Sequence, residues 1–84
     1  MGTTIDEIRE WLKRGHEEGA AYMIVVCDTY DYEDYPVYVM PGTDVKTEYQ
    51  RYNEPDKMSR VMEVYSYAKD LERQLGPHRV KNFE

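Results

Sequence analysis

The sequence predicts one small α+β domain, an antiparallel β-hairpin packed against helices in the order α-β-β-α-α. Three observations predict this class: a capped amphipathic segment at the start, two β-rich apolar runs around a short loop, and apolar residues at helical spacing in the second half. A chain of 84 residues accommodates a single domain, residues 1–84. We expect residues 78–84 to form a tail that either docks or frays.

The first helix is predicted over residues 4–17. Thr4 and Glu7 have the spacing of a capping box, in which the threonine hydroxyl accepts from the third helical N–H. Gly19 is placed to end the helix in a left-handed conformation. One face of this segment is apolar and carries Ile5, Ile8, Trp11 and Leu12.

Two strands are predicted next. Residues 21–27 form an unbroken apolar run rich in β-branched side chains, which is typical of a strand buried on both faces. Residues 36–40 form the second strand, opened by Pro36, and the short loop between the runs favours antiparallel pairing. An isolated hairpin has two open edges, so we expect a homo-oligomer to complete the sheet.

Two helices are predicted in the second half. Thr43 or Asp44 can cap a short helix whose apolar face holds Val45, Tyr49 and Tyr52. A longer helix is predicted over residues 56–75 and ends at Gly76 and Pro77. Its apolar stripe consists of Val61, Val64, Ala68, Leu71 and Leu75, and Met58, Met62 and Tyr65 widen it.

Composition restricts the classes of partner. Eleven basic and 17 acidic residues give a formal net charge of −6, which disfavours binding to nucleic acids and anionic membranes.

The single cysteine, Cys27, excludes an internal disulfide framework and is expected to be a buried structural thiol. No apolar run reaches the roughly 20 residues that span a bilayer. No catalytic or phosphate-binding motif is present, so we expect a non-enzymatic protein without a cofactor.

The acidic hairpin, residues 28–35, is the densest feature of the sequence. It is a solvated turn, a docking surface for a basic protein groove, or a Ca²⁺ or Mg²⁺ site. The metal alternative lacks the glycine and ligand order of an EF-hand loop, so no metal is expected. The candidate binding residues are Asp28, Tyr30, Asp31, Tyr32, Glu33, Asp34 and Tyr35.

A second candidate site lies in the predicted last helices. Arginine can hold a phosphate bidentately while tyrosine stacks on a base, so the residues are suited to a nucleotide. We expect such a pocket to form between subunits, because a small monomer has little concave surface. Its residues are Tyr49, Arg51, Tyr52, Arg60 and Tyr65.

Residues 23–39, together with the later Met-Glu-Val-Tyr segment at 62–65, resemble small uncharacterised proteins encoded by bacteriophages and prophages. The resemblance implies a viral accessory protein that acts by binding in the cytoplasm of its bacterial host. The expected function is inhibition of a bacterial defence system through contact of the acidic hairpin with a host protein. The alternative is a sponge that sequesters a nucleotide immune signal at an oligomer interface, and a role in virion assembly also stays open.

Overall fold

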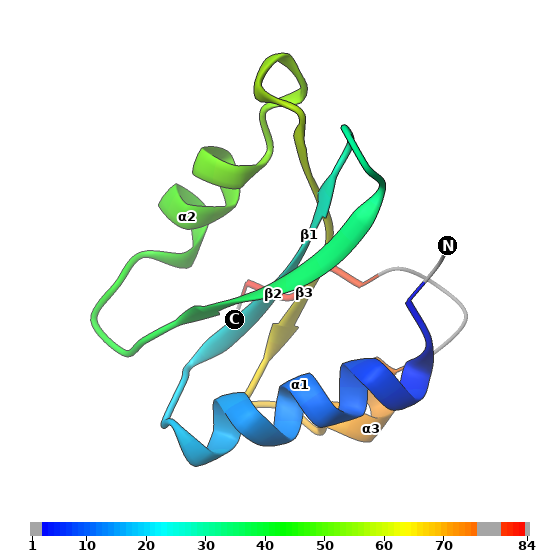
Figure 1. Cartoon of the computed structure of the whole chain (residues 1–84). Coiled ribbons are helices and arrows are strands. Elements are labelled where there is room, and N and C mark those ends of the chain that lie inside the picture. Colours follow the sequence, from blue (N-terminus) through cyan, green and yellow to red (C-terminus); the bar gives the residue numbers. More distant parts are fainter. Residues whose placement is uncertain (1–2, 76–79, 84) are drawn as a thin grey trace.

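The computed structural model describes residues 3–75 and 80–83, which form a three-stranded antiparallel sheet in the order β2-β1-β3 with helices on both faces (Figure 1). The α+β class and the hairpin are confirmed. The elements are α1 (Ile5–Glu17), β1 (Tyr22–Asp28), β2 (Glu33–Val39), α2 (Val45–Tyr52), a 3-10 turn η1 (Pro55–Lys57), β3 (Ser59–Ser66) and α3 (Leu71–Gln74).

Side-chain caps start the first two helices where the sequence predicts them. The Thr4 hydroxyl oxygen accepts a hydrogen bond from the Glu7 N–H at 3.2 Å, and the Asp44 carboxylate accepts from the Lys46 N–H at 3.1 Å. Each cap satisfies a backbone donor that has no partner inside the helix. Of the two predicted caps for α2, Asp44 is the one used.

Strand β1 is the centre of the molecule. Met23 and Val25 face α1, whereas Ile24 and Val26 face α2, and all four side chains are at most 1 % exposed. The apolar run is therefore a strand buried on both faces, as predicted, because a central strand covered on both sides buries both of its faces.

The predicted helix over residues 56–75 is wrong, because residues 59–66 form strand β3 beside β1. The physical reason is a β-bulge. Ile24 pairs with Val64 and Val26 with Val61, so a step of two residues on β1 matches a step of three on β3. Val61 and Val64 thus share the face toward α2. Their separation of three residues is also the separation of neighbours on one face of a helix.

We expected a second copy of the chain to pair with the hairpin. Strand β3 of the same chain provides that pairing. One edge of the sheet is β2, where Pro36 removes a backbone donor. The other edge is β3, where the Val64 N–H donates to the Val80 carbonyl at 2.8 Å and the Asn82 N–H donates to the Val64 carbonyl at 3.0 Å. Oligomerisation stays a prediction, but completing the sheet no longer requires it.

Two tyrosines fix α1 against the sheet. The Tyr38 hydroxyl donates to the Trp11 carbonyl at 2.7 Å, and the Tyr67 hydroxyl donates to the Leu12 carbonyl at 2.8 Å. Gly15 lies between these rings and is buried. Burial raises the pKa of both phenols above their ordinary value, so both stay protonated donors.

The part of the predicted tail that the structure describes docks on the sheet. Phe83 packs edge-on against Tyr49, with ring centroids 5.2 Å apart, and its carbonyl accepts from the Tyr22 hydroxyl at 3.0 Å. Residues 78, 79 and 84 of that prediction lie outside the described residues.

Candidate functional site

The acidic hairpin ends in a turn that its own carboxylates hold. The Asp28 carboxylate accepts from the Tyr30 N–H at 2.8 Å, and the Asp31 carboxylate accepts from the Glu33 N–H at 3.0 Å. Tyr32 adopts a left-handed backbone conformation with φ of 58°, and its N–H donates to the Asp28 carbonyl at 2.6 Å. Such Asx hydrogen bonds substitute for backbone pairing in a tight turn.

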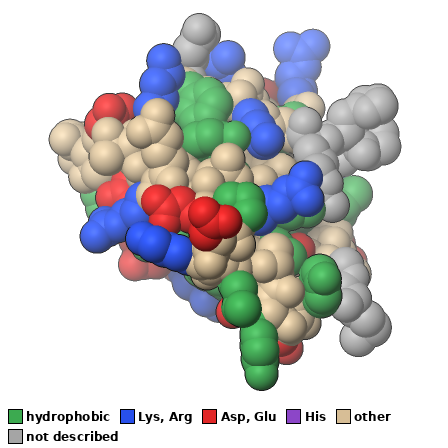
Figure 2. Space-filling model, turned by 90° about the horizontal axis from the view of Figure 1, so that it is seen from above, with side chains coloured by type: hydrophobic (Ala, Val, Ile, Leu, Met, Phe, Trp, Pro, Cys, Tyr) green, Lys and Arg blue, Asp and Glu red, His purple; other side chains and the backbone are tan. Residues whose placement is uncertain are grey.

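Large apolar side chains project from this turn. Tyr30 is 79 % exposed, Tyr32 is 67 % exposed, and Met58, in the neighbouring loop just before β3, is 52 % exposed. The Thr29 N–H donates to the Met58 carbonyl at 3.0 Å, which brings the two loops together. Figure 2 looks down on this end of the molecule, where hydrophobic side chains protrude beside acidic ones. We call Tyr30, Asp31, Tyr32, Glu33 and Met58 the tip surface.

The remaining predicted hairpin residues have different surroundings. Asp34 accepts a hydrogen bond from the Thr3 hydroxyl at 2.7 Å, which holds the chain just before α1. Tyr35 lies beside the tip surface, is 39 % exposed and pairs with Val26 of β1. Asp28 is half-buried at the end of β1 and serves the turn. The structure therefore brings the predicted residues to one end of the molecule, but only some of them are available to a partner.

A hollow of about 550 Å³ lies between the tip surface and the first turn of α1. It is lined by Thr3, Thr4, Glu7 and residues 31–34, so several carboxylates surround it. Over residues 3–75 and 80–83, no group of histidine, cysteine, aspartate and glutamate side chains is arranged to hold a metal ion. The acidic hollow therefore offers charge and hydrogen-bond acceptors rather than a preformed coordination shell.

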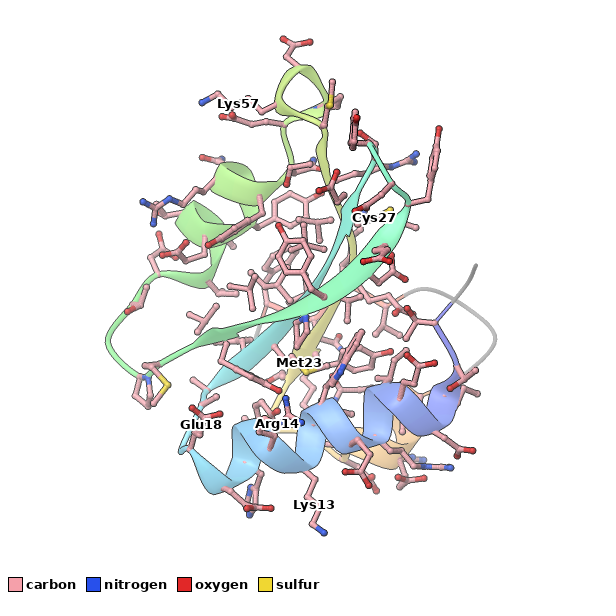
Figure 3. The ribbon with its side chains drawn as sticks, viewed as in Figure 1. Lys13, Arg14, Glu18, Met23, Cys27 and Lys57 are labelled. Carbon is pink, nitrogen blue, oxygen red and sulfur yellow. The ribbon has the colours of Figure 1, made fainter. Side chains whose placement is uncertain are left out.

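Cys27 lies under the tip, at the end of β1 (Figure 3). Burial raises the pKa of its thiol, and the neighbouring Asp34 carboxylate raises it further. The thiol Sγ lies 3.8 Å from the Asp28 carbonyl oxygen, to which it donates. A protonated thiol among carboxylates is a weak nucleophile, so this environment gives no chemical activation.

The predicted nucleotide-binding residues are not brought together within the chain. Tyr49 and Tyr52 pack on the sheet face covered by α2, whereas Tyr65 is 1 % exposed in the core on the opposite face. Arg51 is exposed and pairs with Glu48 at 3.6 Å. Arg60 is exposed on β3, opposite Cys27. The prediction placed Tyr65 and Arg60 on a helix, and the bulged strand separates them from the tyrosines of α2.

Sequence reasoning missed Met58 as a surface residue. The helical spacing predicts Met58 in the apolar stripe of a helix, whereas in the structure it follows the turn at Pro55–Lys57 with φ of 58°. The signal that could have found it is the run Asn53-Glu54-Pro55-Asp56, whose residue types are typical of turns and separate two elements.

Comparison with known proteins found no matching family model, curated sequence or solved structure. Among the described residues, no helix has the length and apolar character needed to cross a membrane.

Proposed function

We propose that this protein binds a partner protein through the tip surface and that the partner's contact surface is basic. The observation that carries the proposal is the exposure of two phenol rings, 79 % for Tyr30 and 67 % for Tyr32, at the end of a hydrogen-bonded hairpin. Tyrosine rings supply large, rigid contact area with a polar tip, and they are enriched among the residues that dominate binding energy.

The charge of the tip surface favours lysine and arginine on the partner. Asp31 and Glu33 flank the exposed Tyr32, and the acidic hollow lies beside them. A cationic side chain entering this region gains charge-assisted hydrogen bonds from the carboxylates and a cation–π contact with a phenol ring. The net charge of −6 adds long-range attraction to a basic surface.

The partner we propose is a component of a bacterial defence system, which the protein inhibits by occupying a functional surface of that component. This setting comes from the resemblance of residues 23–39 to phage-encoded proteins. The inhibition requires no catalysis, in keeping with the unactivated environment of Cys27. The host cytoplasm would be the place of action.

Nucleotide sequestration has less support than protein binding. Tyr65 is buried on the sheet face opposite to Tyr49 and Tyr52, so a base cannot stack on these rings together within one chain. A shared pocket would need a second subunit to contribute Arg51 or Arg60, both of which are exposed.

Site-specific cross-linking tests where the partner binds. A photoreactive phenylalanine analogue is placed at Tyr32 in one variant and at Met40 in another, because Met40 is 43 % exposed just beyond the other end of β2. Both variants are expressed in bacteria that carry a defence system. We expect one specific cross-linked host protein from the Tyr32 position and none from the Met40 position. Equal products from both positions would contradict the proposal.

The charge of the tip is then tested with the captured partner. Asp31→Asn with Glu33→Gln should lower the association rate and flatten its salt dependence, because the attraction that guides encounter is removed. The Asp31→Asn change keeps the side-chain oxygen that accepts from the residue 33 N–H, so the turn survives. Glu10→Gln with Glu17→Gln, both exposed on α1, is the matched control for net charge. An equal loss in the control pair would show that net charge, not the tip, guides binding.

The phenol rings are tested by dissociation. Tyr30→Ser with Tyr32→Ser should weaken binding by about 2 kcal/mol or more, mainly by faster dissociation. The same variant should fail to restore phage plaque formation in defended bacteria. Binding and plaque counts that match the wild type would exclude the tip surface as the contact.

A further inference from the structure

Residues of α1 and α3 line a groove. Figure 1 shows these two helices side by side at the end of the molecule opposite to the hairpin turn. Its volume is about 330 Å³, at the lower end of the range for small-molecule sites. The lining residues are Arg9, Leu12, Lys13, His16, Leu71 and Glu72.

The floor of the groove is apolar. Leu12 is buried in the core cluster beneath α1, and Leu71 packs against the same cluster from α3. Both leucines nevertheless line the groove, so an apolar ligand group placed there would extend an existing hydrophobic core.

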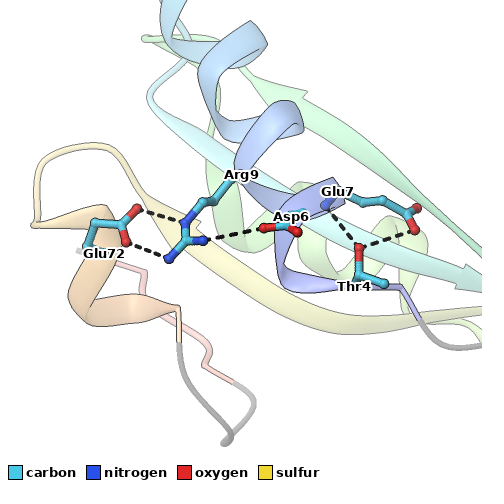
Figure 4. A network of polar contacts seen from close by, with 5 residues as sticks. All are labelled: Thr4, Asp6, Glu7, Arg9 and Glu72. Carbon is cyan, nitrogen blue, oxygen red and sulfur yellow. Dashed lines mark hydrogen bonds and ion pairs between the residues drawn. The ribbon is translucent and has the colours of Figure 1, made fainter.

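One wall of the groove is a closed ion pair. The Arg9 guanidinium donates to both oxygens of Glu72, at 3.2 Å from Nε and 2.9 Å from Nη2, and it also lies 3.5 Å from Asp6 (Figure 4). This bidentate contact joins α3 to α1. Because Glu72 and Asp6 already engage the guanidinium, Arg9 is not a free anion receptor.

Two further donors of α1, Lys13 and His16, line the groove. Lys13 is exposed, and no acidic group of the described residues lies within 4.0 Å of its ammonium, although Glu10 and Glu17 line a neighbouring hollow with it. Lys13 extends from α1 toward solvent in Figure 3. His16 lies one turn further along the helix, its ring stacked on Tyr67 with centroids 6.4 Å apart. The groove thus combines an apolar floor with cationic and N–H donors on one rim.

We propose that this groove binds a small amphipathic carboxylate, whose chain or ring lies on Leu12 and Leu71 and whose carboxylate meets Lys13 and His16. Local charge complementarity carries the choice of occupant, because the lysine and histidine donors beside an apolar floor favour an anion with an apolar body. The inference does not depend on the tip surface.

A titration of the full chain, labelled with ¹⁵N, tests the proposal with sodium octanoate as the probe. We expect saturable amide shifts at residues 12–16 and 71–72. Octylamine, which has the same chain with the opposite charge, and acetate, which lacks the chain, should not saturate these amides. No saturable shift with octanoate, or equal saturation with octylamine, overturns the proposal.

Two lysine variants sharpen the test. Lys13→Gln should weaken octanoate binding about fivefold, as expected for loss of one exposed charged contact. Lys46→Gln makes the same charge change on α2 and should leave the affinity unchanged. Equal affinities of the two variants would overturn the site. A Tyr30→Ser, Tyr32→Ser variant should bind octanoate like the wild type. Failure of the groove proposal can therefore be told apart from failure of the tip-surface proposal.

Discussion

At the residue scale, Gly15 sets how closely α1 approaches the sheet. A Cβ built on Gly15 would lie 2.6 Å from the Tyr38 ring and would collide with the Tyr67 hydroxyl. Both tyrosines donate hydrogen bonds to carbonyls of the same helix turn. Because position 15 has no side chain, α1 lies close enough to the sheet to pack against both tyrosines and to accept their hydrogen bonds.

Gly15→Ala should lower the free energy of unfolding by about 1–2 kcal/mol. Overpacking costs about 1–3 kcal/mol, and the better helix propensity of alanine returns at most about 1 kcal/mol. Chemical denaturation provides the measurement, with Glu10→Ala on the exposed face of α1 as the control. A more stable Gly15→Ala variant would contradict the close approach.

Tyr67→Phe should cost about 1 kcal/mol at neutral pH, because the Leu12 carbonyl loses a hydrogen bond. Burial raises the pKa of the Tyr67 phenol above its ordinary value of 10.0, and the charges of Tyr38 and Glu18 add to this. The native state thus holds the proton more tightly than the unfolded state. The stability that Tyr67 contributes is fully present below pH 10 and is lost as the pH rises through the raised pKa.

Denaturation of the wild type and Tyr67→Phe across this range measures the effect. The stability difference should stay constant below about pH 10, the ordinary pKa of a phenol, and shrink above it. A difference that grows with pH would have the wrong sign. Tyr30→Phe, which removes an exposed hydroxyl, should leave the neutral-pH stability unchanged.

At the scale of elements, the buried side chain of Gln74 links α3 to β3 and to Asn82. Gln74 accepts from the Ser66 N–H at 2.8 Å and donates to the Ser66 carbonyl at 2.9 Å. It also accepts from the Asn82 amide at 2.9 Å and donates to the Asp70 carbonyl at 3.1 Å. A helix of one turn has little stability of its own, so these hydrogen bonds fix α3 at the end of β3.

Gln74→Leu should lower the free energy of unfolding by about 2–3 kcal/mol. The substitution keeps similar volume but leaves buried backbone groups of Ser66 without the glutamine partner. Gln50→Leu, at an exposed position of α2, is the matched control and should change stability by less than about 0.5 kcal/mol. Equal losses in the two variants would indicate that the Gln74 hydrogen bonds contribute nothing.

At the scale of the whole molecule, the chain extends its own hairpin into a three-stranded sheet. The described residues of the C-terminal segment pair with Val64 along the edge of β3, and Phe83 covers Tyr49 on the α2 face. Strand β3, the helices and this segment therefore cover both faces of the hairpin and one of its edges, whereas β2 remains an edge strand. Sedimentation over a concentration series measures whether copies associate for another reason.

Phe83→Ala should lower the free energy of unfolding by about 2 kcal/mol, less than full burial would give, because the ring is half-buried. The loss should appear in hydrogen exchange as faster exchange of the Val64 amide, which donates to the Val80 carbonyl. Met40→Ala removes a large exposed side chain and serves as control. Unchanged protection of Val64 would show that the segment holds without its aromatic anchor.

Helices α1 and α2 and the hairpin follow from local signals, whereas strand β3 does not. Thr4, Asp44 and the apolar run of β1 each act over a few residues, so α1, α2 and the hairpin are predictable. The spacing of Val61 and Val64 fits both a helix and a bulged strand, and only pairing with β1 decides between them. The acidic residues of the tip were visible in the sequence, whereas Met58 and the groove between α1 and α3 depend on tertiary contacts.

The carboxylates that hold the hairpin turn have a consequence for recognition. Because Asp28 and Asp31 already bond the backbone of the free protein, the tip has little conformational freedom left to lose when it meets a partner. Free and bound forms of the turn should superimpose closely, as in pre-organised inhibitors. Affinity would then be limited by how well the other surface fits, not by the ordering of this loop.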